Sequence, residues 1–390
     1  MGIRRRLGHL LGPGKAMKPS RMRSLTASPG GAGRALMSYV LDPFEVDSED
    51  KISHDHTHHW ESFQNARSLL EAGFDVDVVH YTDRRFVPST DYDILVSART
   101  QLERLAGHLP AHCVKIAHLD TAHWLTNNAR AYERLLACRD RQGVALRDNK
   151  LIEQNWAIEH ADIGCVLGND WTAGTYAYAG KPVHRIPISA PAVYDWGGAK
   201  KVEDCRRNFI WFGSSGFVHK GLDLVLEAFT ELPDYRLFVC GPFDAEPRFT
   251  AGLRHLLFER DNVVAEGWVD VAGDRFREIA EQCIGLVYPS CAEGGGASAI
   301  TCMHAGIIPI VTLETSVDTP GFGVGLQTAS VEEIRDTVRE VSALGADELQ
   351  RRSRAAWEYA REHHTREGFA RAYRRFVDEV VLPAVKARRA

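Results

Sequence analysis

The segment from residue 288 to residue 311 constrains the fold more than any other part of this 390-residue chain; it reads YPSCAEGGGASAITCMHAGIIPIV. An apolar run meets Pro289 and Ser290, and an acidic residue and three glycines follow. A helix-length apolar segment then begins at Ser298, and Gly306 precedes a second apolar run. This pattern predicts a strand, a glycine loop, a helix and another strand. Because glycine has no Cβ, its backbone can approach a ligand closely, and the next helix offers its positive end.

The same segment resembles the donor-site signature of retaining GT-B glycosyltransferases, especially those of family 4. The residues that match this signature at its spacing are Pro289, Ser290, Glu293, Gly294, Gly296, Met303, Gly306 and Pro309. One position departs from it. The family has a second glutamate eight residues after the first, which binds both ribose hydroxyls, and this chain has Thr301 there. The departure concerns donor affinity and nucleotide identity more than the fold.

Residues 212–221, FGSSGFVHKG, resemble the second donor motif of the family, in which a lysine follows a glycine turn and precedes a helix. The resemblance implies that Lys220 meets the donor diphosphate and offsets the charge of the leaving group. We expect its side chain to be solvent-accessible; the alternative role is a solvated lysine at a helix start. Ser214 and Ser215 replace the arginine of the family, and His219 is a candidate to complete the clamp.

The resemblance also assigns the remaining donor contacts. Glu293 is expected to contact hydroxyls of the transferred sugar, and its alternative role is to cap the helix that follows. Other residues expected at the donor are Gly213, Ser214 and Ser215 in the turn, Trp268 and Val269 near the base, and the loop residues Gly294, Gly295 and Gly296.

Strand-like and helix-like patterns alternate along the chain. In the first half, strand patterns occupy residues 35–40, 76–80, 94–96, 114–117 and 163–167, and helical patterns occupy 60–70, 101–109, 125–139 and 151–160. This alternation favours a parallel, doubly wound sheet. A second alternating set begins at residue 209. We therefore predict an α/β protein of the GT-B type, with two doubly wound Rossmann-like domains facing a cleft.

The domain boundaries follow from the composition of the connecting segments. We predict a basic flexible tail (1–34), an acceptor-side domain (35–190), a linker (191–205) and a donor domain (206–364). A last helix, within about residues 365–390, has an apolar stripe that ends at Pro383. The resemblance implies that this helix packs back on the first domain.

Composition limits the broad class. A hydrophobic content of 44% and a charged content of 25% are typical of a soluble globular protein. No apolar stretch approaches the roughly 20 residues that span a bilayer. The eight cysteines occur singly and without a C-x-x-C pair, which predicts reduced core thiols in a cytoplasmic protein. We expect no nucleic-acid partner.

The first 34 residues hold eight Lys or Arg and no Asp or Glu. Three interpretations fit this composition. The segment is a disordered solubilising tail, the product of a misplaced start codon, or a site of peripheral contact with anionic lipid headgroups.

Residues 53–60, SHDHTHHW, contain His54, His56, His58 and His59. They precede the first predicted helix, which borders the cleft in GT-B proteins. We weigh three roles for them: acceptor contact, for which His58 and His59 are the candidates, a solvated loop, and a metal site. GT-B enzymes generally need no protein-bound metal, so we expect none.

Further polar residues follow two predicted strands at the end where open parallel sheets bind ligands. His118, Asp120 and His123 follow the fourth strand, and Arg99 follows the third. We take His118 and Asp120 as catalytic candidates, and Arg99 and His123 as acceptor-side candidates.

We predict an enzyme that transfers a sugar from a nucleotide diphosphate sugar, with retention and without a further cofactor. Its acceptor is a polysaccharide, a lipid-linked glycan or a small molecule. No second carboxylate stands where an inverting enzyme would need a general base. One alternative is a catalytically silent GT-B domain that binds a glycan or a partner protein, motivated by Thr301 and the missing arginine. Another is a different GT-B enzyme, such as a sugar-nucleotide epimerase or a phosphorylase.

Overall fold

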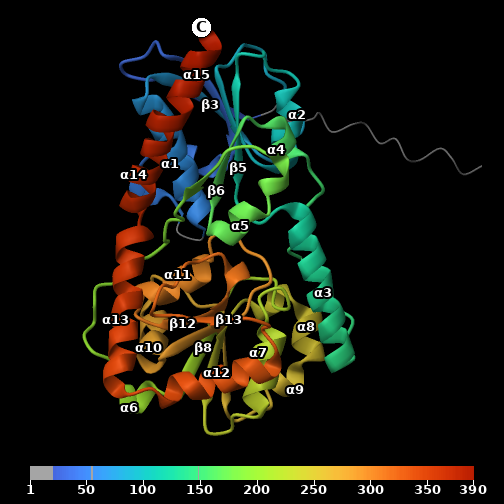
Figure 1. Ribbon diagram of the computed structural model, residues 1–390, viewed down its shortest axis with the longest axis vertical. Helices are drawn as coiled ribbons and strands as arrows, with labels where there is room; N and C mark the ends of the chain where they lie inside the picture. The colour runs from blue at the N-terminus through green and yellow to red at the C-terminus, as the bar shows by residue number, and fades with distance from the viewer. Residues whose placement is uncertain (1–20, 54–55, 148) are drawn as a thin grey trace, which may run out of the picture.

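Two open α/β domains lie one above the other along the longest axis of the molecule in the computed structural model (Figure 1). The structure describes residues 21–53, 56–147 and 149–390. Each domain holds one sheet with helices on both faces. The predicted pair of doubly wound domains is therefore confirmed.

The first sheet has the strand order β1-β3-β2-β4-β5-β6-β7, and every neighbouring pair is parallel except β1 and β3. Its strands are β1 (Met22–Leu25), β2 (Gly33–Tyr39), β3 (Phe74–His80), β4 (Ile94–Ser97), β5 (Val114–Leu119), β6 (Ile163–Leu167) and β7 (Val183–Ile186). Its helices are α1 (Thr57–Glu71), α2 (Arg99–Ala106), α3 (Trp124–Gln142), α4 (Ala157–His160) and α5 (Asp170–Gly174). The chain reverses direction across the sheet between β2 and β4, where ligands bind in such folds.

The second sheet has the order β10-β9-β8-β11-β12-β13, and all its pairs are parallel. Its strands are β8 (Asn208–Phe212), β9 (Arg236–Cys240), β10 (Val263–Gly267), β11 (Gly285–Tyr288), β12 (Ile308–Thr312) and β13 (Val324–Leu326). Its helices are α6 (Val202–Cys205), α7 (Leu222–Thr230), α8 (Pro247–Gly252), α9 (Arg254–Leu257), α10 (Asp274–Gln282), α11 (Ala297–His304), α12 (Val331–Ala343) and α13 (Ala346–His363). The switch point lies between β8 and β11, so both predicted donor motifs begin there.

The C-terminal segment crosses back to the first domain, as the resemblance implied. It consists of α14 (Arg366–Phe376), a π-helical turn (Val377–Val381) and α15 (Leu382–Arg389). Phe369 is fully buried in the core of the first domain, stacked on Tyr373 and edge-on to Trp60. The helical segment continues past Pro383 to Arg389. Proline is tolerated there because it stands in the first turn of α15, where its missing N–H costs no helical hydrogen bond.

The structure differs from three further expectations. The flexible tail was predicted to reach residue 34, but β1 pairs with β3 as an edge strand; residues 1–20 lie outside the described part of the chain. Residues 151–156 are not helical, because the N–H and C=O of Ile152 bond to the side chain of Asn128. The predicted linker contains the short helix α6.

All eight cysteines are buried and unpaired, which agrees with the prediction of core thiols. In the described ranges, no helix has the length and apolar character needed to cross a bilayer.

The burial of Phe369 generates a first prediction. Phe369→Ala should lower the free energy of unfolding by about 3–5 kcal/mol, because it removes an aromatic side chain from a closed core. Urea unfolding measures the loss. Arg371→Ala, an exposed position on the same helix, is the control. Equal effects of the two substitutions would show that the C-terminal segment contributes little to the first core.

Candidate functional site

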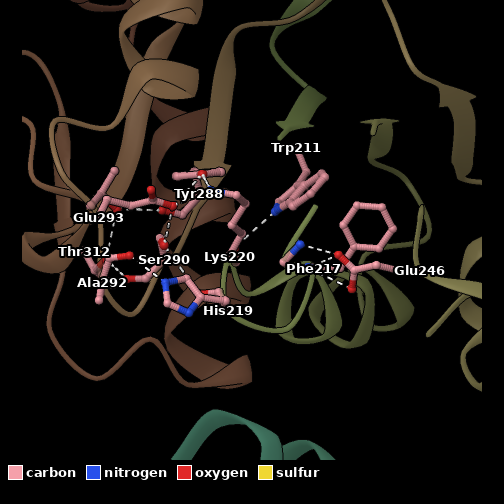
Figure 2. Close-up of polar contacts among 12 residues, drawn as sticks. Trp211, Phe217, His219, Lys220, Glu246, Tyr288, Ser290, Ala292, Glu293 and Thr312 are labelled. Carbon is pink, nitrogen blue, oxygen red and sulfur yellow. Dashed lines mark hydrogen bonds and ion pairs between the residues drawn. The ribbon is translucent and has the colours of Figure 1, made fainter. Parts of the chain in front are cut away.

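The two donor motifs meet where β8 and β11 end, and a buried ion pair joins them (Figure 2). Lys220 Nζ lies 2.5 Å from Glu293 Oε1 and donates to the Tyr288 hydroxyl at 2.7 Å. The expectation of a solvent-accessible Lys220, or of a solvated lysine at the helix start, is wrong, because this residue is only 4% exposed. Burial alone would lower the pKa of Lys220, but the Glu293 carboxylate overrides it and holds the pKa above its ordinary value.

The position of Lys220 depends on a tight turn before α7. The backbone of Gly221 has φ +70°, and a Cβ there would lie 2.5 Å from the Pro289 ring and 2.8 Å from its carbonyl oxygen. Glycine therefore lets the turn touch the Glu293 loop. The Trp211 indole donates to the carbonyl oxygen of Lys220 at 3.1 Å and fixes the other side of the turn (Figure 2).

Every hydrogen bond to the Glu293 carboxylate from the described residues reaches the same oxygen, Oε1. The donors are the Lys220 ammonium, the Ser290 hydroxyl at 2.9 Å and the Tyr288 hydroxyl at 3.0 Å. Burial would raise the pKa of Glu293, but Lys220 lowers it to about 2. Glu293 does not cap α11, whose N-cap is Gly296. The carboxylate is thus ionised, and its second oxygen can accept a hydrogen bond from a ligand.

Five of the predicted donor residues line one cleft of about 180 Å³: Gly213, Ser214, Trp268, Val269 and Thr301. They come from two loops and a helix that are far apart in the sequence. Thr301 is buried, and its hydroxyl donates to Ala297 O at 2.9 Å within α11. The structure therefore places a neutral, internally bonded side chain where the family has a carboxylate.

Other predicted donor residues do not line this cleft. The His219 ring is buried with its Nε2 2.6 Å from Ala292 O, so it supports the Glu293 loop. Ser215 is absent from the cleft lining. A Cβ on Gly294 would lie 2.0 Å from Asp120 O, and a Cβ on Gly296 would lie 2.6 Å from Thr315 O.

Gly295 fits against Ile188 in the same way, with three side-chain carbons 3.1 Å from its Cβ position. The three glycines of the loop therefore allow close packing against neighbouring segments, and Gly294 meets the first domain directly.

The acceptor-side candidates gather at the switch point of the first sheet. A second cavity, of about 350 Å³, is lined by Tyr39, His56, His58, His59, Arg99 and Asp120, among others. His56 lines this cavity and the donor cleft, so the two are adjacent. Arg99 donates twice to the Asp120 carboxylate, at 3.2 and 3.0 Å, and adopts a positive φ of 51°.

His118 and His123 line a third, much smaller cavity, which His58 and His59 do not line. Burial lowers the pKa of His118 to about 4, and its ring packs 4.5 Å from that of Tyr39. Neither ring nitrogen of His118 has a hydrogen-bond partner among the described residues. His123 Nε2 lies 3.0 Å from the Tyr178 hydroxyl. Arg99 and Asp120 line this small cavity as well as the larger one, so they lie between the two groups of histidines.

In the part of the chain that the structure describes, no three His, Cys, Asp or Glu side chains are arranged to hold a metal ion. His54, the first member of the histidine cluster, lies outside the described residues. His56 instead caps α1, because its Nδ1 accepts from the N–H of His58 at 3.2 Å.

Sequence reasoning missed two residues of the site. Tyr288 bonds to both members of the ion pair, and its place as the last residue of β11 was a usable signal. Arg134 of α3, a helix of the first domain, donates to Pro289 O at 3.0 Å. That contact spans 155 positions and has no local sequence signal.

Comparison with solved structures identifies the architecture. The chain aligns with HepE from Anabaena in complex with UDP and glucose (TM-score 0.54, 11% identity, covering 89% of this chain and 98% of that one). It aligns with an E. coli structure described as trehalose-6-phosphate bound with UDP-2-fluoro glucose (TM-score 0.58, 7% identity, 88% and 98%). It also aligns with sucrose-phosphate synthase from Thermosynechococcus elongatus (TM-score 0.53, 14% identity, 90% and 99%).

The chain spans little more than half of the length of two further matches, TarM structures of which it covers 55% and 54%. No family model matches the sequence, and no curated protein matches it. At these identities the likeness concerns the fold, and the chain has the GT-B fold that the sequence predicted.

The ion pair generates a second prediction. Lys220→Met should destabilise the protein by about 3–5 kcal/mol, because it leaves the Glu293 carboxylate buried without its cation. The double variant Lys220→Met/Glu293→Gln should recover most of this loss. Urea unfolding of the wild type, both single variants and the double variant gives the coupling energy. Effects that add within about 0.5 kcal/mol would contradict a coupled pair.

A third prediction concerns pH. The pKa of Glu293 is lowered in the folded protein, so its stabilising effect is complete above the unfolded pKa of about 4.3 and is lost as the pH falls towards 2. The free energy of unfolding should therefore fall less between pH 6 and pH 3 in Lys220→Met/Glu293→Gln than in the wild type, by about 1–2 kcal/mol. Parallel pH profiles would mean that Glu293 is not held ionised.

Proposed function

We propose that this protein is a retaining glycosyltransferase that transfers a sugar from a nucleotide diphosphate sugar to an acceptor hydroxyl. One observation carries the proposal. Side chains of separate donor loops line a single cleft beside the Lys220–Glu293 pair, between two Rossmann-like domains. Three neutral residues of that cleft, Gly213, Ser214 and Thr301, leave room for a nucleoside at the carboxyl ends of the strands.

The solved structures with this fold support the choice of donor. HepE is in complex with UDP and glucose, and the E. coli structure is bound with UDP-2-fluoro glucose. A uridine diphosphate sugar is therefore the first donor to test. The exposed Trp268 and the neighbouring Val269 are proposed to meet the base at the outer end of the cleft.

In the proposed reaction, the Lys220 ammonium faces the diphosphate that leaves. Glu293 Oε2 accepts a hydrogen bond from a hydroxyl of the transferred sugar, since Oε1 already has three donors. The acceptor binds beside His58, His59 and Arg99, in the cavity next to the donor cleft. Its hydroxyl oxygen bonds to the anomeric carbon as the bond from that carbon to the phosphate oxygen breaks, and its proton passes to the departing phosphate.

Asp42 and Asp120 are the carboxylates that line the acceptor cavity, and the environment of Asp120 supports retention over inversion. Burial would raise its pKa, but the Arg99 guanidinium holds the pKa below its ordinary value. A carboxylate that is ionised and bonded twice to arginine is a weak general base. We therefore assign Asp120 to acceptor orientation.

The fourth prediction tests the donor site through Thr301. The wild type should bind UDP, GDP or ADP, and Thr301→Glu should bind the preferred one about tenfold more tightly. The added carboxylate can accept two ribose hydroxyls, and charge-assisted bonds typically contribute about 1.5–3 kcal/mol each before imperfect geometry reduces the gain. Calorimetric titration measures both affinities.

Thr301→Gln is the matched control, because glutamine has nearly the same size as glutamate and carries no charge. Weaker binding by Thr301→Glu would show that the cleft is shaped around the smaller threonine, because a carboxylate buried without its partner is costly. If no diphosphate binds the wild type, the proposed function is wrong.

A further inference from the structure

Among the described residues, the lining of the donor cleft includes no lysine or arginine. The charge of Lys220 is balanced by Glu293, and the turn that precedes it carries Ser214 and Ser215. Glu246 on the far side of this turn accepts hydrogen bonds from the N–H groups of Gly216 and Phe217, at 3.1 Å for the latter (Figure 2). A diphosphate brings several negative charges, so a further cation is needed close to the turn.

Lys150 lies directly on this turn, although it comes from the other domain. It follows α3, in the segment that leads to α4 and β6. A Cβ on Gly216 would lie 2.6 Å from Lys150 Cγ and 3.1 Å from its Cε. The aliphatic chain of Lys150 therefore packs on the bare backbone of Gly216, which has a φ of +93°.

The backbone around Lys150 is held in place by α3. Asn127, a buried residue of that helix, donates to the carbonyl oxygen of Lys150 at 3.0 Å. The next residue, Asn128, bonds to both the N–H and the C=O of Ile152 at 2.8 Å. Two neighbouring asparagines thus fix the chain on either side of position 151, so the placement of Lys150 is built into the fold.

The same segment touches the second domain at a second point. A Cβ on Gly252 of α8 would lie 2.6 Å from Val144 Cγ1. Further back in α3, Arg141 pairs with Asp223 and Glu227 of α7. Helix α3 runs down beside the second domain, as Figure 1 shows. The loop with Lys150 is therefore docked on the donor domain at two points, Val144 and Lys150.

The charge of Lys150 is felt by groups inside the cleft. Desolvation and then the Lys150 charge lower the pKa of His56, which lines the donor cleft. The Lys150 charge also contributes to the lowered pKa of Glu293, after the larger effect of Lys220. The Lys150 ammonium therefore lies within electrostatic range of both His56 and Glu293.

We propose that Lys150 supplies the second cation of the diphosphate site, from the opposite domain and in place of the arginine that the serines of the turn replace. This assignment rests on the proposed function. The diphosphate would lie between Lys150 and Lys220 and would link the two domains by its charge.

The test compares Lys150→Met and Lys150→Arg with the wild type by calorimetric titration of UDP, uridine and inorganic pyrophosphate. Lys150→Met should weaken UDP and pyrophosphate about tenfold or more and change the affinity for uridine less than about twofold, because only the phosphates meet the ammonium. Lys150→Arg should retain most of the affinity. Arg147→Met, an exposed position three residues earlier in the same loop, should bind like the wild type.

Equal UDP and pyrophosphate affinities in Lys150→Met and the wild type would overturn the assignment. A parallel loss of uridine binding would also overturn it, because it would indicate a displaced loop. If the wild type binds pyrophosphate in a Lys150-dependent way but binds no nucleotide, the anion site stands and the proposed donor is wrong. Failure of the wild type to bind any of the three probes would overturn both proposals.

Discussion

The buried pair of Lys220 and Glu293 is the interaction on which the site depends. It joins residues 73 positions apart, and it forms because β8 and β11 are hydrogen-bonded neighbours whose carboxyl ends lie together. Removing two charges from water is costly, and the hydroxyls of Tyr288 and Ser290 offset part of this cost by bonding to the same carboxylate oxygen. The strand order of the second sheet is therefore a condition for the chemistry of its loops.

The Glu293 loop is also held from the first domain. Thr172 of α5 lies with its hydroxyl 3.4 Å from Glu293 O, and Gly294 fits against the backbone of Asp120. Asn169 donates to Leu313 O at 3.0 Å in the neighbouring loop. The carboxylate that is proposed to meet the sugar thus takes its position from both domains. A shift of one domain relative to the other would therefore disturb the contacts that hold the Glu293 loop.

Much of the fold and part of the site were predictable from local sequence. Alternating apolar patterns predicted the two sheets, and the glycine-containing motifs picked out residues that line one cleft, such as Gly213 and Thr301. The burial of Lys220 was not predictable, because it depends on which strands become neighbours. The proposed contribution of Lys150 depends on the docking of α3, and no sequence motif marks this residue.

The location of the cations bears on how such a site works. A cation in the same turn as Lys220 would attract a diphosphate whether or not the domains were in contact. A cation on the loop after α3 acts only when that loop rests on Gly216. The contact of Val144 with Gly252 likewise forms only when the loop is docked on the second domain. Electrostatic attraction at close range weakens steeply with distance and solvent, so the two lysines reinforce each other only in the closed arrangement. Under the proposed role of Lys150, the neutral serines in the turn make anion binding conditional on domain contact, and the first domain is part of the proposed donor site.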